Sequence, residues 1–152
     1  MNFETDKIIE EIFEIISLNN DRVTLLEQIS KLLKEKVFHY DWVGFYILNE
    51  MKNGLVLGPY AGAHTDHTFI PVGKGVCGQV AENKISMVVQ DVTKMENYLS
   101  CSLNVQSEIV VPIIKNGEFV AELDIDSHSP APFTDKDTIL LEKICNALAD
   151  YF

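Results

Sequence analysis

The sequence lacks long apolar runs and an excess of positive charge. No apolar run approaches the roughly 20 residues that a membrane-spanning helix needs, so no such helix is expected. Lysine and arginine number 12 against 23 aspartates and glutamates, which gives a net charge of −11. Because this charge repels phosphate groups and anionic lipids, we expect no nucleic acid and no membrane among the partners.

Cysteine is also scarce. The chain has three cysteines, Cys77, Cys101 and Cys145, which are too few for a disulfide framework. The first six residues are acidic and lack the basic start of a secretory signal, so we expect a cytoplasmic location. In that reducing compartment, a disulfide would be transient and catalytic rather than structural.

What the chain does contain is the patterning of one globular domain over 1–152. Apolar stripes predict helices at 6–18, at 25–33 with Asp21 as N-cap, and at 140–148 with Thr134 as cap. Strands are predicted at 41–48, 55–57, 86–90, 108–114 and 118–126, with hairpin turns at Asn53-Gly54 and Asn116-Gly117. The segments 59–78 and 91–106 are predicted to be long loops, the first ending in a short helix at 76–80. This order indicates an α+β fold, an antiparallel sheet with helices packed on one face and long loops over the other.

The three cysteines differ in their surroundings. Residues 73–78 match the spacing G-x-G-x-x-G, but no βαβ unit is predicted there, so we do not read them as a dinucleotide site. Cys77 instead lies at a predicted helix N-terminus, where its thiol has a lowered pKa or packs as a small buried side chain. Cys101 lies in the second long loop, which favours a reactive thiol. Cys145 lies on an apolar helix stripe and is predicted to be core.

Other candidates are acidic and aromatic. Asp124 and Asp126 share one strand face, and with Glu108 they form either a site for an ammonium group or metal, or an exposed acidic strand end. A metal is the less favoured ligand because no tight ligand spacing is visible. Trp42 and Tyr46 share a face and form either a pocket wall or part of the core.

Several motifs occur together in a fixed order. They are Asp41-Trp42-Val43-Gly44-Phe45-Tyr46, Leu57-Gly58-Pro59, residues 70–78, Asp91-Val92, residues 107–112 and Leu123-Asp124-Ile125-Asp126-Ser127. This set resembles the free methionine-(R)-sulfoxide reductases, which are single GAF domains, over roughly residues 40–130. The GAF fold by itself would be weak support, because it also serves ligand sensors.

The resemblance implies an oxidoreductase without a cofactor. Cys101 would attack the sulfoxide sulfur and become a sulfenic acid, and Cys77 would resolve it to a disulfide that thioredoxin or a similar thiol reductant reopens. Trp42 and Tyr46 would surround the methyl and sulfur. The carboxyls of Glu108, Asp124 and Asp126 would hold the ammonium or polarise the sulfoxide oxygen, and backbone N–H groups near Gly75 and Val76 would bind the carboxylate.

Two departures accompany the resemblance. Many members carry a third, resolving cysteine at the position of His67, so this chain resembles the two-cysteine branch. The pair Ala121-Glu122 also differs from the small apolar residues expected before the Asp-Ile-Asp motif. The alternative function is a GAF sensor of a small ligand or of redox state, and a homodimer is an open option for either.

Overall fold

The computed structural model describes residues 3–96, 98 and 104–152, and its order of elements is that of an α+β fold. The elements are α1 (Phe3–Leu18), α2 (Arg22–Lys36), β1 (Trp42–Leu48), β2 (Gly54–Ala61), β3 (Phe69–Pro71), α3 (Gly75–Asn83), β4 (Met87–Val89), the 3₁₀ turn η1 (Val92–Lys94), β5 (Ser107–Lys115), β6 (Glu118–Ser127), α4 (Asp135–Leu148) and the 3₁₀ turn η2 (Ala149–Tyr151). Six strands of the described chain form one sheet in the order β3-β2-β1-β6-β5-β4, and every neighbouring pair is antiparallel.

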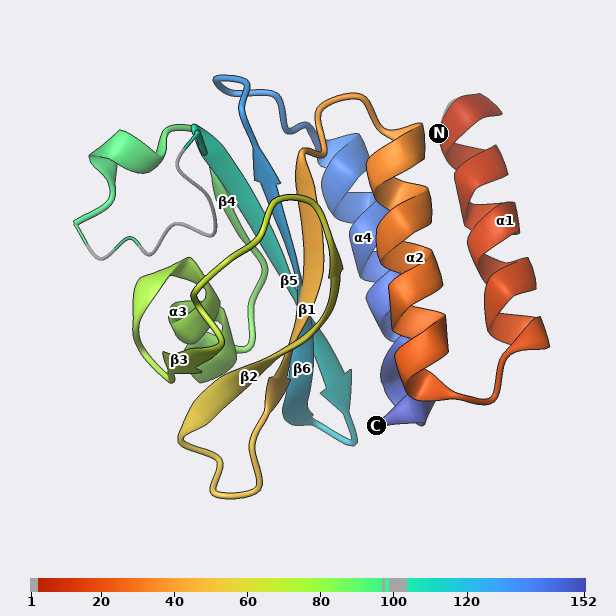
Figure 1. Cartoon of the computed structure of the whole chain (residues 1–152), viewed down its shortest axis with the longest axis horizontal. Helices are drawn as coiled ribbons and strands as arrows, with labels where there is room; N and C mark the ends of the chain where they lie inside the picture. Colours follow the sequence, from red (N-terminus) through yellow and green to blue (C-terminus); the bar gives the residue numbers. More distant parts are fainter. Residues whose placement is uncertain (1–2, 97, 99–103) are drawn as a thin grey trace.

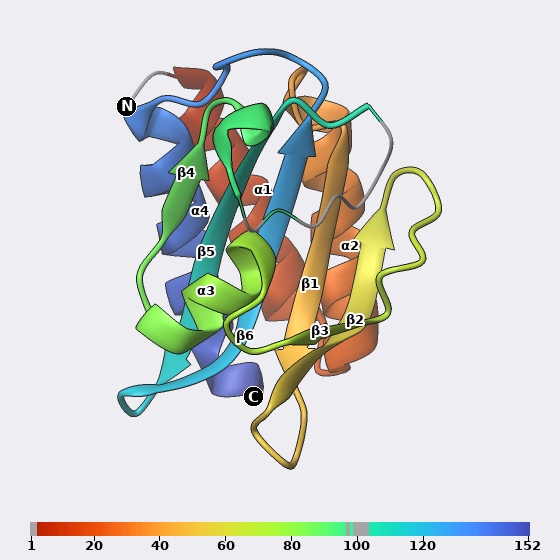
Figure 2. The same cartoon turned by 90° about the vertical axis from the view of Figure 1, so that its left-hand side faces the viewer.

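Two layers cover the sheet. Figure 1 shows α1, α2 and α4 on one side of the sheet, and Figure 2 shows α3 crossing in front of β5 and β6 on the other. The predicted antiparallel sheet with helices on one face is therefore confirmed. The short helix predicted at 76–80 is also present, as part of the nine-residue helix α3 on the loop-covered face. Within the described residues, no helix is long and apolar enough to cross a membrane.

Local signals in the sequence explain several element ends. The Asp21 carboxylate accepts a hydrogen bond from the Thr24 N–H at 2.9 Å and caps α2, as predicted. The Thr134 N–H donates to the Asp137 carboxylate at 2.8 Å, as in a capping box at the start of α4. Asn116 and Gly117 have φ values of 52° and 79°, the positive values that a tight type I′ hairpin requires.

The loop predicted at 59–78 is partly wrong. Strand β2 continues to Ala61, and Phe69–Pro71 forms the short strand β3. The sequence signal was misleading because Pro59 cannot donate a ladder hydrogen bond. Pro59 lies where the β1–β2 register shifts, between the pairs Tyr46↔Leu57 and Gly44↔Tyr60, and an interrupted ladder tolerates the missing donor.

Candidate active site

The candidate site is built on the sheet face that α3 covers, which we call the site face. Alternation along β1 turns Trp42, Gly44 and Tyr46 toward this face, while Val43 and Phe45 join the core under the other helices. In the β1–β6 register these three residues lie opposite Asp126, Asp124 and Glu122. Strand pairing therefore brings aromatic and acidic side chains together in one layer.

A fourth carboxyl comes from β5. Glu108 pairs with Asp126 in the β5–β6 register, although 18 residues separate them in the chain. Glu108, Glu122, Asp124 and Asp126 are all at most 1% exposed. The alternative of an exposed acidic strand end is thus excluded for Glu108, Asp124 and Asp126, and Glu122 is an acidic residue that the sequence analysis noted without assigning it to the site.

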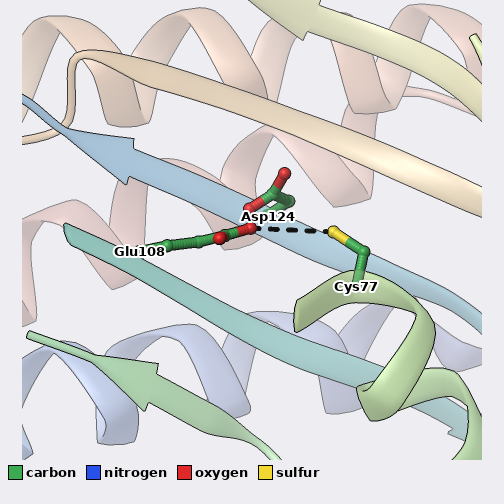
Figure 3. Close-up of side chains that lie close together, drawn as sticks. All are labelled: Cys77, Glu108 and Asp124. Atoms are coloured by element: carbon green, nitrogen blue, oxygen red, sulfur yellow. Dashed lines mark hydrogen bonds between the residues drawn. The ribbon is translucent and has the colours of Figure 1, made fainter. Parts of the chain in front are cut away.

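The thiol of Cys77 reaches the acidic cluster from α3. Cys77 lies in the first turn of that helix and is 4% exposed. Its Sγ donates a hydrogen bond to Oε1 of Glu108 at 3.8 Å, drawn as the dashed line in Figure 3. The backbone of α3 packs closely against the end of β3 at Gly78. A side chain would not fit there, because a Cβ at Gly78 would lie 2.5 Å from the carbonyl oxygen of Pro71.

Burial and mutual repulsion set the protonation of the carboxyls. Burial raises the pKa of Glu108 well above its ordinary value, and the charges of Asp124 and Asp126 raise it further. Burial also raises the pKa of Glu122, and the neighbouring Cys77 thiol partly offsets this rise, so the thiol faces two carboxyls. Such a cluster holds protons or attracts a cation, because several buried negative charges are costly without either.

Three aromatic rings wall one side of the site face. The rings of Trp42 and Tyr60 stack with centroids 5.2 Å apart, and those of Trp42 and Tyr46 lie 6.3 Å apart. Gly44 makes room for this arrangement, because a Cβ there would lie 2.3 Å from the Trp42 indole. The sequence analysis did not identify Tyr60, because Gly58-Pro59 indicated a loop where strand β2 in fact continues.

The position of His67 borders this wall. The Tyr46 hydroxyl donates to the His67 carbonyl oxygen at 2.9 Å, and the Trp42 Nε1–H donates to the Ala63 carbonyl oxygen at 3.1 Å. The segment between β2 and β3 is therefore tied to the aromatic wall at two points. His67 lies next to the candidate site, where the resemblance expects a third cysteine in many relatives.

The start of α3 contains the remaining predicted site residues. Gly75 and Val76 are buried in its first turn, two residues and one residue before Cys77. Helix α3 connects β3 and β4, which lie at opposite edges of the antiparallel sheet and run in opposite directions, so these elements form no βαβ unit of a dinucleotide site.

Cys101 lies outside the described residues. The residues nearest to it in the chain that the structure describes are Tyr98 and Asn104. Tyr98 and Val105 both pack against the hydrophobic cluster that contains Trp42 and Cys77. The chain thus has contacts with the site face three residues before Cys101 and four residues after it.

Comparison with known proteins identifies relatives of this chain. The GAF domain family matches residues 21–151. The free methionine-R-sulfoxide reductase of Saccharomyces cerevisiae is 33% identical, with 97% of this chain and 89% of the yeast protein covered. A structure of the free methionine-R-sulfoxide reductase of Neisseria meningitidis with its substrate has a TM-score of 0.92 and 33% identity, covering 97% of this chain and 87% of that one. The reduced Staphylococcus aureus fRMsr has a TM-score of 0.88 and 34% identity, covering 97% and 94%.

Proposed function

The chain belongs to the free methionine-R-sulfoxide reductases, oxidoreductases of the GAF domain family, and on this premise we propose that it reduces free methionine-(R)-sulfoxide to methionine. The observation that carries the proposal is the buried layer in which a thiol, several carboxyls and an aromatic wall meet. Those groups match the needs of a small zwitterion that carries a polar sulfoxide and an apolar methyl group.

The acidic cluster supplies the ammonium site in this proposal. Asp124 and Asp126 lie side by side on β6, and their negative charges favour a bound ammonium group, which relieves the cost of their burial. Burial and the charges of Asp124 and Asp126 raise the pKa of Glu108, which favours its protonated form, and the protonated carboxyl donates a hydrogen bond to the sulfoxide oxygen. One strand pair thus provides both acceptors and a donor.

The other two parts of the substrate have neighbours as well. The rings of Trp42 and Tyr46 contact the methyl and sulfur, which aromatic rings favour. The carboxylate binds at the N-terminus of α3 near Gly75 and Val76, where backbone N–H groups and the helix dipole favour an anion. A methionine sulfoxide residue within a peptide lacks the free ammonium and carboxylate, so this site selects the free amino acid.

The chemical step belongs to Cys101 in this proposal. Its thiolate attacks the sulfoxide sulfur, the oxygen passes to Cys101 as a sulfenic acid, and methionine leaves with both electrons of the reduction. The Cys77 thiol then attacks that sulfenic sulfur, which forms a disulfide and releases water. Thioredoxin or a similar dithiol reduces the disulfide and returns both thiols.

The contacts on either side of Cys101 support this assignment. Tyr98 packs against the cluster that contains Cys77, and three residues of chain span at most about 11 Å. Disulfide formation needs the two cysteine Cα atoms within about 7 Å in some accessible state. The short chain between Tyr98 and Cys101 is therefore compatible with an approach of Cys101 to Cys77.

The test is turnover of purified, reduced protein on each epimer of free methionine sulfoxide. We expect reduction of the R epimer with dithiothreitol and with thioredoxin, complete loss in Cys101→Ser, and retention in Cys145→Ala. Cys145 is the matched control because it is a buried cysteine on the opposite face of the sheet. A folded wild-type protein that reduces neither epimer would overturn the proposal.

The second candidate function is a GAF sensor without turnover, and the residue that favours it is His67. Its carbonyl is hydrogen-bonded to Tyr46, so the position borders the site, yet it offers no resolving thiol. A sensor would bind methionine sulfoxide and leave all thiols unchanged, which free-thiol counting before and after addition of the sulfoxide distinguishes.

A further inference from the structure

The strongest unassigned feature is the close approach of three ligating atoms from three elements. Cys77 of α3, Glu108 of β5 and Asp124 of β6 each present one atom, and these atoms all lie within 4.8 Å of one another (Figure 3). In a tetrahedral zinc site with bonds of about 2.0–2.3 Å, ligand atoms lie about 3.3–3.8 Å apart. The Cys77–Glu108 pair, at 3.8 Å, already has this separation.

A second observation points to a cation at the same place. Glu122 is fully buried, and neither of its carboxylate oxygens has a hydrogen-bond partner among the described residues. The second carboxylate oxygen of Glu108, Oε2, also has no hydrogen-bond partner among these residues. Glu122 shares a strand face with Asp124, and its carboxyl faces the Cys77 thiol. Further acceptor oxygens are therefore aimed at the group of three.

We propose that Cys77, Glu108 and Asp124 form a binding site for a thiophilic divalent cation, with Zn²⁺ as the ion that fits and Glu122 beside it as a further oxygen ligand. A thiolate with carboxylates suits Zn²⁺, whereas Mg²⁺ and Ca²⁺ prefer oxygen alone. The sequence analysis disfavoured a metal because these ligands are far apart in the chain. Strand register and the placement of α3 bring them together.

Coordination is balanced by release of protons. Zn²⁺ takes the place of the thiol proton of Cys77 and of protons on the buried carboxyls, and these pass to the buffer. No electron is transferred. The cation then occupies the place assigned above to the substrate ammonium and sulfoxide oxygen, so it inhibits the reductase reversibly. This last consequence rests on the proposed function, whereas metal binding itself rests on the side-chain geometry.

The direct test uses Co²⁺ as a spectroscopic probe for the thiolate ligand. Protein reduced with a phosphine and freed of reductant is titrated with Co²⁺, and thiolate-to-cobalt charge transfer is followed in the near ultraviolet. We expect one equivalent bound per chain in the wild type, in Cys101→Ser and in Cys145→Ala, and no charge-transfer band in Cys77→Ser. A band that persists in Cys77→Ser, or none in folded wild-type protein, would overturn the site.

Zn²⁺ calorimetry tests the oxygen ligands. We expect Asp124→Asn to weaken Zn²⁺ binding by at least about 100-fold, since even the loss of a residue that only orients a metal ligand costs about 10–100-fold. Glu122→Gln is expected to weaken it about tenfold and to lower the number of protons released. Unchanged affinity in both variants, with circular dichroism showing a folded chain, would contradict the proposal.

Competition is measured separately, in a single turnover without added thiols, because dithiothreitol and thioredoxin bind zinc. We expect Zn²⁺ to raise the methionine sulfoxide concentration needed for half-maximal reaction without changing the maximal rate. Inhibition that high sulfoxide cannot relieve would contradict the shared position. A protein that binds Zn²⁺ at Cys77 but reduces no sulfoxide would refute the proposed function and leave the metal site standing.

Discussion

The two faces of the sheet use alternate residues of the same strands for opposite purposes. On β6, Leu123 and Ile125 pack into the core beneath α1, α2 and α4. Their neighbours Glu122, Asp124 and Asp126 turn to the site face, where they are equally buried. Burial of apolar side chains stabilises the fold, whereas burial of carboxyls destabilises it. The helix-covered face therefore offsets the unfavourable free energy of the site face.

The two described cysteines repeat this contrast. Cys145 is 1% exposed, its thiol donates to the Val111 carbonyl oxygen, and burial raises the pKa of that thiol. Cys77 is 4% exposed, but its thiol faces the carboxyls of Glu108 and Glu122. Burial therefore does not distinguish the two thiols, whereas the polarity of their neighbours does.

The largest expected effects come from separate single substitutions of two adjacent residues on β6, one facing each side of the sheet. Leu123→Ala opens a cavity in the helix-covered core and should lower the free energy of unfolding by about 2–5 kcal/mol, measured by denaturant titration. Asp124→Asn should keep the fold and raise KM for methionine sulfoxide about 10- to 100-fold, because a hydrogen bond to a charged group contributes about 1.5–3 kcal/mol. An Asp124→Asn protein with unchanged KM would remove this carboxyl from the substrate site.

The cysteine pair gives the next largest effect. Cys77→Ser should preserve the first turnover and slow thioredoxin-dependent recycling by about tenfold or more, because the Cys101 sulfenic acid then waits for an external thiol. Cys145→Ala should leave both phases unchanged. Rapid-quench measurement of methionine separates the phases, and equal loss in both would count against Cys77 as the resolving thiol.

The smallest predicted effect concerns how stability depends on pH. The folded-state pKa of Glu122 is raised, so the folded state binds its proton more tightly than the unfolded chain does. The stability it confers is present at low pH and lost as pH rises above the ordinary glutamate value of 4.5, by up to about 1.4 kcal/mol per pH unit. Glu122→Gln should flatten this decline in denaturant titrations between pH 5 and 8, and an unaltered slope would contradict the raised pKa.

Asp137, at the start of α4, provides the opposite sign as an internal control. Burial raises its pKa, but hydrogen bonds from His39, Thr134 and Tyr40 outweigh it and lower the pKa from 3.8 to about 2. Its contribution is present above pH 3.8 and is lost as pH falls toward 2. The Glu122→Gln substitution should leave this acid limb unchanged.

Much of this architecture could be read from periodicity and turn residues. Alternation placed Asp124 and Asp126 on one face, and Asn116-Gly117 marked its hairpin, because both signals are local in the chain. The extent of β2 was missed because Pro59 looks like a strand breaker until the register shift that accommodates it is known. The local sequence pattern therefore predicts individual helices and strands well, but it does not predict how a strand pairs with its neighbours in the sheet.

The site itself depended on contacts that spacing does not encode. Glu108 meets Asp126 through strand register, and Cys77 reaches Glu108 through the packing of α3. Glu122 appeared in the sequence only as a departure from the expected motif, although its distance of two residues from Asp124 was the available signal. The family resemblance, and not residue spacing, assigned Cys101, which lies outside the described residues.

The measurement that tests the central claim most directly is peptide mapping after one equivalent of methionine-(R)-sulfoxide is added to the reduced protein. The account predicts one equivalent of methionine and a disulfide between Cys77 and Cys101, with Cys145 still a free thiol. Methionine formed with Cys77 remaining reduced, or a disulfide that includes Cys145, would contradict it.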